Sequence, residues 1–264
     1  MPPPQGPFGN VIRSAAQPDG ATPSARLIQS DMQYLADWGG GVVVLPAGTS
    51  PVVLEAQLVM LPQVSLHIPA GCVVRAAVGY TGDLIGASNV SGSRIFGDGA
   101  LIGNYDYTLT NHGIYLQTCQ QIVIHRLRVA GFGGSGIRID NDGYNRIAEV
   151  TSQDNGTNGI YLNGTTQDNQ ITDCWVFGNS QQGAGLGHGI TILGGARYNT
   201  FTNCHIFDGA DGTPTTFPAT QDRPIVEVTG SSGTPDYTFI YALQSHGHVT
   251  SNEPLLLGVH SGVV

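Results

Sequence analysis

The sequence predicts an all-β solenoid, a parallel β-helix, because one phrase returns along the chain at a regular spacing. The phrase is Gly-Ile, then one polar, charged or aromatic residue, then Leu or Ile. It begins at Gly113, Gly136, Gly159 and Gly189. The steps from 113 to 136 and from 136 to 159 are 23 residues each, and the step from 159 to 189 is 30 residues. A repeat in this range indicates a chain that winds into stacked coils.

A second phrase with the same spacing adds two apolar columns to the predicted core. The columns are Ile124, Ile147, Ile171 and Phe201, and Leu127, Val150, Cys174 and Cys204. An Asn stands two residues before three of these segments, at Asn145, Asn169 and Asn199. Amides stacked in a turn bond the copies above and below, so we expect a structural ladder. Short strands, turns rich in Gly and Asn, and columns in register are typical of a parallel β-helix.

The composition and net charge of the chain limit the kinds of molecule that it is expected to bind. The 264 residues include 38 Gly, only 11% are charged, and the net charge is −9. Such a surface disfavours nucleic acid and anionic membranes. We expect no membrane insertion, because no apolar run is long enough to span a bilayer. We also expect no signal peptide, because the first ten residues lack the basic and apolar regions of one.

The four cysteines, Cys72, Cys119, Cys174 and Cys204, show no metal-ligand spacing. The sequence therefore predicts no metal site and no cofactor. Cys174 and Cys204 fall in one inward column and are interpreted as small core residues. A disulfide between stacked coils is the alternative.

The start of the chain predicts an arm, a helix and a strand. Residues 1–22 are expected to form an irregular N-terminal arm that ends at a turn. A capping helix is predicted over 23–38, with Thr22 as N-cap and Pro23 at the first helical position. Apolar residues recur on one face of this helix, and a run of three Gly ends it. A buried strand is expected at 42–45.

These opening motifs resemble the start of pectate-lyase-superfamily β-helices, a group that includes phage tailspikes. The motifs are Asp19-Gly20, Ile28-Gln29 within the helix, the Gly run, and Val44-Leu45-Pro46-Ala47-Gly48. The resemblance covers residues 19 to about 206. It implies a right-handed parallel β-helix whose first helix plugs an end of the sheets that would otherwise recruit other strands. It does not specify a reaction, because this fold carries lyases, hydrolases, epimerases and adhesins.

The remainder of the chain continues the same domain. Less regular coils are expected from 52 to 103, a loop excursion at 208–222, and final strands near 225–228, 237–241 and 255–259. Ile225 stands where the next coil needs its Ile, 35 residues after Ile190. Residues 23–264 are therefore predicted to form one β-helix domain without a linker.

Outward residues of the Gly-Ile strands form the main candidate site, because side chains alternate across a strand. Coils lie about 4.8 Å apart, so these residues make one patch. Aromatic rings, a guanidinium, a carboxylate and amides suit a sugar, whereas a plain solvated or subunit-facing sheet is the alternative. The candidate substrate-binding residues are Tyr115, Gln117, Arg138, Asp140, Tyr161, Asn163 and, on a second outward set, Trp175.

Candidate catalytic residues are Arg138, Asp140, Glu149 and Asp173. Hydrolysis of a glycoside needs two carboxylates about 5–10 Å apart, which Asp140 with Asp142, or Glu149 with Asp173, could supply. A lyase needs a base beside a cation, and Arg138 with Asp140 is the nearest such pair. The alternative is ordinary surface charge, because 19 acidic residues produce such pairs by chance.

Two functions remain open at this point. In the first, the chain is a structural and receptor-binding spike or fibre subunit on the surface of a phage-like particle, a phage or a gene transfer agent. Cell-surface polysaccharide would be its ligand, and the resemblance implies a homotrimer. The N-terminal arm would contact other particle proteins. In the second, the chain is a polysaccharide lyase or glycoside hydrolase.

Overall fold

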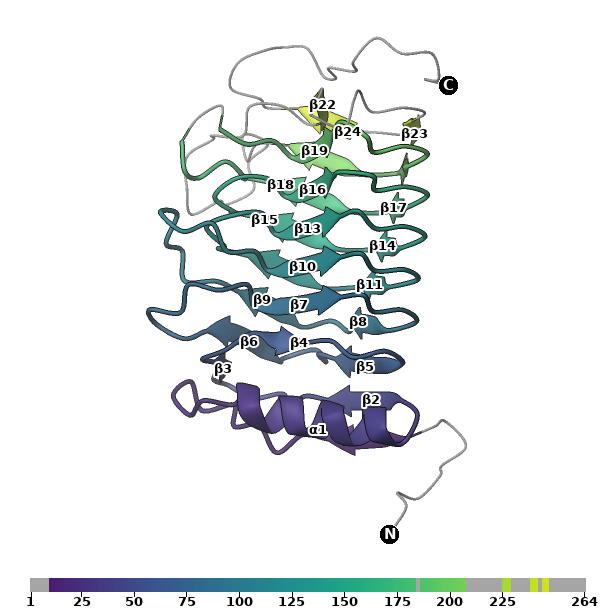
Figure 1. The fold of residues 1–264 in the computed structure, drawn as a ribbon. Coiled ribbons are helices and arrows are strands. Elements are labelled where there is room, and N and C mark those ends of the chain that lie inside the picture. Colours follow the sequence, from purple (N-terminus) through teal and green to yellow (C-terminus); the bar gives the residue numbers. More distant parts are fainter. Residues whose placement is uncertain (1–9, 184–185, 208–224, 229–237, 242–243, 247–264) are drawn as a thin grey trace.

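A computed structural model shows stacked coils with helix α1 (Ala25–Asp37) across one end (Figure 1). The structure describes residues 10–183, 186–207, 225–228, 238–241 and 244–246. Over these residues the strands form three parallel sheets that run along the solenoid axis. The predicted parallel β-helix is confirmed.

Within the described residues the sheets hold nine, seven and eight strands, each paired with the strands one coil away. The nine-stranded sheet comprises β1 (Val11–Arg13), β2 (Gly41–Val44), β5 (Val64–His67), β8 (Arg94–Phe96), β11 (Val123–His125), β14 (Arg146–Ala148), β17 (Gln170–Thr172), β20 (Thr200–Thr202) and β23 (Phe239–Tyr241). The seven-stranded sheet comprises β4 (Leu58–Val59), β7 (Ile85–Ser88), β10 (Ile114–Gln117), β13 (Ile137–Asp140), β16 (Ile160–Asn163), β19 (Ile190–Leu193) and β22 (Ile225–Val228). The eight-stranded sheet comprises β3 (Val52–Leu54), β6 (Val73–Ala76), β9 (Ala100–Ile102), β12 (Arg128–Ala130), β15 (Thr151–Gln153), β18 (Trp175–Phe177), β21 (His205–Phe207) and β24 (Gln244–His246).

The core consists of apolar columns in register. In the seven-stranded sheet one column is continuous from coil to coil and each member is 0% exposed: Ile85, Ile114, Ile137, Ile160, Ile190 and Ile225. Burying one such side chain contributes about 1.5–3 kcal/mol. The register confirms the place predicted for Ile225 in the coil after Ile190.

The glycine that opens each repeat is required by close packing between two sheets. A Cβ atom on Gly113 would lie 2.5 Å from Val129 Cγ1, and one on Gly159 would lie 2.2 Å from Val176 Cγ1. Val129 and Val176 belong to β12 and β18. Glycine therefore lets the start of the seven-stranded sheet approach the eight-stranded sheet.

The second repeated phrase consists of four residues that start at Ile124, Ile147, Ile171 and Phe201, and it runs from the end of one strand into a corner. Its third residue is left-handed in four successive coils, with φ of 57° at Arg126, 53° at Glu149, 55° at Asp173 and 51° at Asn203. This conformation ends the strand of the nine-stranded sheet and redirects the chain into the eight-stranded sheet. Glu149 and Asp173 are therefore corner residues.

The predicted amide ladder is confirmed. Asn169 Oδ1 accepts the backbone N–H of Asn145 at 2.9 Å, and Asn199 Oδ1 accepts that of Asn169 at 3.2 Å. A second ladder that the sequence analysis missed joins Asn155 to Asn179, whose Oδ1 accepts the Asn155 N–H at 3.2 Å. All five amide residues are buried, so each ladder satisfies backbone groups that water cannot reach.

The N-terminal segment differs from its prediction in two respects. Residues 11–13 of the expected irregular arm form β1, which pairs in parallel with β2. The helix begins at Ala25, after Ser24 at the cap position, because the Thr22 hydroxyl bonds Asp19 instead of capping the helix. Ile28, Met32 and Leu35 are buried against the first coil, as expected for a helix that covers the end of the sheets.

Several expectations lie outside the described residues: part of the arm, the excursion at 208–222 and the strand at 255–259. All four cysteines are free thiols in buried positions, so the alternative of a disulfide is not realised. Within the described part of the chain, no helix has the length and apolar character needed to cross a bilayer.

We predict that Asn169→Ala lowers the free energy of unfolding by about 2–3 kcal/mol, because it leaves buried backbone groups unsatisfied. Urea denaturation would measure the change. Gln120→Ala, at an exposed turn position, is the control and should change stability by less than about 0.5 kcal/mol. Equal effects of the two substitutions would contradict a structural role for the ladder.

A buried carboxyl group makes stability depend on pH. Asp142, two residues after β13, is 2% exposed. Its Oδ1 accepts the Cys119 N–H at 2.6 Å, while its Oδ2 has no hydrogen-bond partner among the described residues. Burial raises the pKa of Asp142 from 3.8 to about 7. Between these values the folded chain holds a proton that the unfolded chain has released, so the free energy of unfolding falls as pH rises.

We predict that Asp142→Asn raises the free energy of unfolding at pH 8 by at most about 4 kcal/mol, and by much less near pH 4. Denaturation curves at the two pH values would measure the difference. Asp37→Asn, at the exposed end of α1, is the control and should give the same small change at both. A pH-independent effect of Asp142→Asn would refute the assignment.

Candidate functional site

A polar pocket with a volume of about 560 Å³ lies over the start of the seven-stranded sheet and is called the main pocket below. It is lined by residues from the loops that precede β7, β10, β13, β16 and β19, and by outward residues of the strands. The lining residues are Thr81, Gly82, Asp83, Thr110, Asn111, His112, Tyr115, Gly134, Ser135, Arg138, Thr157, Asn158, Tyr161 and Leu186. Five successive coils therefore contribute to one cavity.

Three predicted site residues, Tyr115, Arg138 and Tyr161, form the floor of this pocket. They occupy the same outward position on β10, β13 and β16 and are aligned in register. The Arg138 guanidinium carbon lies 5.3 Å from the Tyr115 ring centroid and 5.4 Å from that of Tyr161. The guanidinium is thus held between two aromatic rings by cation–π attraction. The face that each tyrosine ring turns toward Arg138 is therefore covered by the guanidinium.

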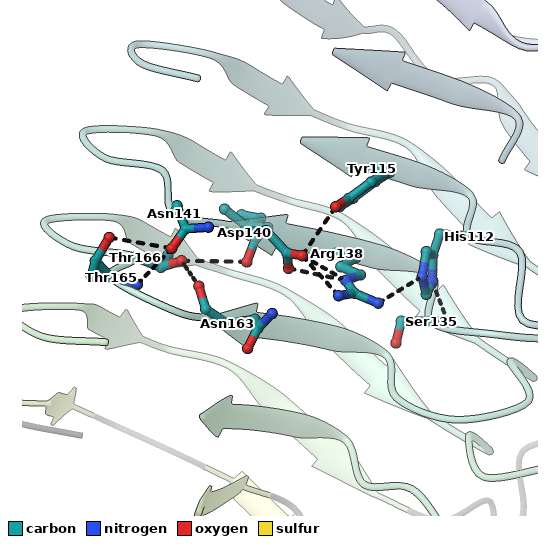
Figure 2. A network of polar contacts seen from close by, with 10 residues as sticks. His112, Tyr115, Ser135, Arg138, Asp140, Asn141, Asn163, Thr165 and Thr166 are labelled. Atoms are coloured by element: carbon teal, nitrogen blue, oxygen red, sulfur yellow. Dashed lines mark hydrogen bonds and ion pairs between the residues drawn. The ribbon is translucent and has the colours of Figure 1, made fainter. Parts of the chain in front are cut away.

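Asp140 fixes the orientation of Arg138, as Figure 2 shows. Arg138 Nε donates to Asp140 Oδ1 at 3.0 Å and Nη2 donates to Oδ2 at 2.7 Å, a bidentate pair. The Tyr115 hydroxyl also donates to Oδ2, at 3.0 Å. The hydrogen bonds between Arg138 and Asp140 raise the pKa of Arg138. Burial, and after it the negative charge of Asp140, raises the pKa of Tyr115 to about 12. Asp140 is 5% exposed and does not line the pocket.

A polar column forms one wall of the pocket. Its members, Asp83, His112, Ser135 and Asn158, each stand two residues before a strand of the seven-stranded sheet. At three of these positions the side chain accepts the backbone N–H of the residue one coil further on. Asp83 Oδ1 accepts from His112 at 2.7 Å, and His112 Nδ1 accepts from Ser135 at 2.9 Å. Asn158 Oδ1 accepts from His188 at 3.0 Å. Burial lowers the pKa of His112, so its ring is neutral at pH 7.

The sequence analysis missed this column, although a signal was present. Each member stands immediately before the strand phrase, and the sequence has Asn111-His112 directly before Gly113. Reading the residue before each Gly as a column of its own would have found His112, Ser135 and Asn158. Asp83 precedes Leu84-Ile85, where Leu replaces Gly, so the phrase search passed over it.

Loops close the rim of the pocket. The Gln182 side-chain amide donates to the carbonyls of Leu109 at 2.9 Å and Gly133 at 2.8 Å. It therefore ties the loop after β18 to two loops of earlier coils. Leu186, in the same loop, is 64% exposed at the rim. This loop accounts for the 30-residue step in the repeat.

The other predicted residues are not brought into the pocket. Gln117 and Asn163 align with Asp140 further along the strands but do not line the cavity. Glu149 Oε1 lies 3.1 Å from His125 Nε2, and Asp173 Oδ1 accepts a hydrogen bond from Asn203 Nδ2 at 2.6 Å. These two carboxylates lie at the corners between the other two sheets.

Trp175 lies on a different face, since it begins β18 in the eight-stranded sheet. It is 49% exposed, and its ring centroid lies 4.6 Å from that of His205. A separate cavity of about 160 Å³ adjoins it and shares no lining residue with the main pocket. The predicted substrate-binding set is therefore divided between two surfaces.

The composition of the main pocket favours binding of a polar, uncharged ligand. Of the described residues that line it, Asp83 supplies the one carboxylate and Arg138 the one guanidinium. A pair of carboxylates, which glycoside hydrolysis normally uses, is thus not present in the described lining. No group of three or more potential metal ligands was found in the described part of the chain.

The stacked coils and the pocket that spans them define a β-solenoid with a candidate ligand site. The chain belongs to the family described as the right handed beta helix region, whose model matches residues 80–233. The right-handed winding implied by the opening motifs is thereby confirmed. A search of curated proteins by sequence gave no match.

Solved structures with a similar fold include phage proteins. The N-terminal fragment of bacteriophage phi29 gene product 12 is 13% identical with a TM-score of 0.73, over 89% of this chain and 41% of that chain. A mutant tailspike protein of E. coli bacteriophage HK620, in complex with a pentasaccharide, is 11% identical with a TM-score of 0.62, over 91% and 49%. A protein from Parabacteroides merdae, proposed to be a glycosyl hydrolase, is 15% identical with a TM-score of 0.58, over 90% and 98%.

At these identities the similarity establishes the fold, which is the fold of phage tailspikes. The chain spans less than half of each of the two phage proteins. Function must therefore be inferred from the pocket.

We predict that Asp140→Ala lowers the free energy of unfolding by about 3 kcal/mol, because it leaves the partly buried Arg138 charge without a partner. Asp98→Ala is a matched control. Asp98 Oδ1 lies 2.7 Å from Arg126 Nη2, the same distance as in the Arg138–Asp140 pair. The side chains of Asp98 and Arg126 are, however, both about half exposed. The control should cost less than about 1 kcal/mol in chemical denaturation. A small effect at Asp140 would contradict its role in holding Arg138.

Proposed function

We propose that this chain is a spike or fibre subunit of a phage-like particle and that it binds cell-surface polysaccharide in the main pocket. The observation that carries the proposal is the Tyr115–Arg138–Tyr161 stack on the pocket floor. A guanidinium held by a buried carboxylate and by two rings loses little freedom on binding, so its remaining N–H groups are preorganised donors.

The pocket has the size and chemistry that a saccharide requires. Its volume of about 560 Å³ lies in the usual range for sites that hold small molecules. Hydroxyl groups of a sugar can donate to Asp83 and to backbone carbonyls, and can accept from Arg138 and Asn158. The wall crosses several coils, so a chain of sugars can extend along the solenoid axis.

Assembly and location follow from the same proposal. Exposed aromatic groups on the outer sheets, Trp175 and Tyr241, are suited to contacts between subunits of a homotrimer. The N-terminal arm would attach the subunit to other particle proteins, which would place the β-helix at the particle surface. The phage proteins of similar fold support this context.

Cleavage of the polysaccharide is the second candidate function, favoured by the similarity to a proposed glycosyl hydrolase. Against it, Asp140 has its oxygens bonded to Arg138 and Tyr115, and Asp83 lacks a second carboxylate in the described lining. Of the described lining residues, Asp83, His112 and Arg138 are the groups that remain as candidates for acid–base chemistry. We expect binding without turnover.

We predict that Tyr161→Ala weakens binding to the recognised polysaccharide at least about tenfold, because an aromatic contact and the support of Arg138 are lost together. Surface plasmon resonance on immobilised capsular and lipopolysaccharide preparations would measure it. Tyr34→Ala, on the exposed side of α1 and outside the pocket, is the control and should bind normally.

Two further measurements distinguish the candidate functions. Solution mass should correspond to a trimer, and incubation with the bound polysaccharide should release no reducing ends and no unsaturated product. An active monomer would overturn the spike proposal, whereas a trimer that binds without cleavage would exclude the enzyme.

A further inference from the structure

Two hydrogen-bond donors meet in the pocket without an acceptor between them. His112 Nε2 lies 3.4 Å from Arg138 Nη1 (Figure 2). An arginine nitrogen is a donor only. The contact is a hydrogen bond only if His112 Nε2 carries no proton, so the chemistry depends on which imidazole nitrogen is protonated.

A hydrogen bond from the backbone determines which ring nitrogen of His112 carries the proton. The Ser135 N–H donates to His112 Nδ1 at 2.9 Å, so Nδ1 must be unprotonated. The same position in neighbouring coils holds atoms that accept a backbone N–H in the same way: Asp83 Oδ1 and Asn158 Oδ1. A neutral ring with Nδ1 as acceptor carries its proton on Nε2. Nε2–H and Nη1–H are therefore two adjacent donors at the pocket wall.

Such a pair calls for an acceptor oxygen from a ligand. Among the described residues no acceptor is bonded to Nε2–H, and Arg138 already directs Nε and Nη2 to Asp140. Both groups are held in place, His112 by Ser135 and Arg138 by Asp140 and the tyrosine rings. An oxygen that bridges the two nitrogens would accept a hydrogen bond from each of them.

The charges near the pair favour an uncharged acceptor. Arg138 and Asp140 compensate each other, His112 is neutral, and Asp83 adds a negative charge to the lining. The whole chain carries −9. A carboxylate or phosphate would meet unfavourable charge, whereas a carbonyl oxygen would not.

We propose that His112 and Arg138 bind the carbonyl oxygen of an acetamido group, and that the pocket is specific for a 2-acetamido sugar. This inference rests on the proposed function. An acetamido group offers an acceptor oxygen to the two donors and an N–H to the Asp83 carboxylate, which lies beside His112 on the same wall. His112 is then a specificity-determining residue, because the tautomer with a proton on Nε2 can donate to the acetamido oxygen.

The tautomer and the ligand are tested together by NMR of the ¹⁵N-labelled full chain. Long-range imidazole spectra should show Nδ1 of His112 without a proton and Nε2 with one at pH 7. The probes are methyl N-acetylglucosaminide, methyl glucoside, methyl glucosaminide and methyl glucuronide. The His112 Nε2–H signal should shift on titration with the N-acetyl probe and much less with the other three.

A matched pair of variants isolates the donor. His112→Phe removes it, whereas His112→Gln restores an N–H near the Nε2 position, and both lose the acceptor for Ser135. We expect His112→Phe to weaken binding of the N-acetyl probe about fivefold to tenfold, and His112→Gln to recover most of it. The variants share the same backbone loss, so a folding defect would affect both.

A proton on Nδ1, equal shifts with the glucoside, a larger shift with the glucuronide, or no shift would each overturn the acetamido assignment. Glycan binding is judged separately, from the polysaccharide measurement on Tyr161→Ala, so it can stand when the acetamido assignment fails.

Discussion

Every coil of this solenoid must stack on its neighbours in register, because the backbone hydrogen bonds and the apolar core both run between coils. A shift by one residue would turn the column from Ile85 to Ile225 outward and the polar residues between them inward. Glycine before the strand, asparagine in the turn and a left-handed corner residue all serve this alignment. The shape of the molecule follows from that single requirement.

The same alignment builds the candidate site. Residues that are 23 positions apart in sequence become direct neighbours, so Tyr115, Arg138 and Tyr161 meet although no local motif connects them. Their chemistry then depends on their neighbours. Arg138 is oriented by Asp140 and the two rings, and His112 is oriented by Ser135. The pocket is thus formed by residues that were first positioned by the core.

The architecture and the pocket floor could be predicted from the sequence because both depend on periodicity. Strand alternation correctly placed Tyr115 and Arg138 outward, but it could not reveal that Asp140 is buried beneath its partners. Alternation also gave no sign that Glu149 is a corner residue, because a single left-handed residue leaves no mark on the apolar pattern. Whether Trp175 shares a face with Tyr115 depends on the corners, which periodicity does not describe.

The polar column has a consequence for how such a protein can change. Its bonds run from a side chain in one coil to the backbone of the next, so they are independent of the length of the loop that leads into each coil. The loop that contains Leu186 lengthens its coil to 30 residues, yet Asn158 still bonds His188 at 3.0 Å. Loops at this edge can therefore be lengthened or exchanged while the frame beneath them stays constant. A lineage can acquire a new ligand preference here by insertion alone, without redesigning its core.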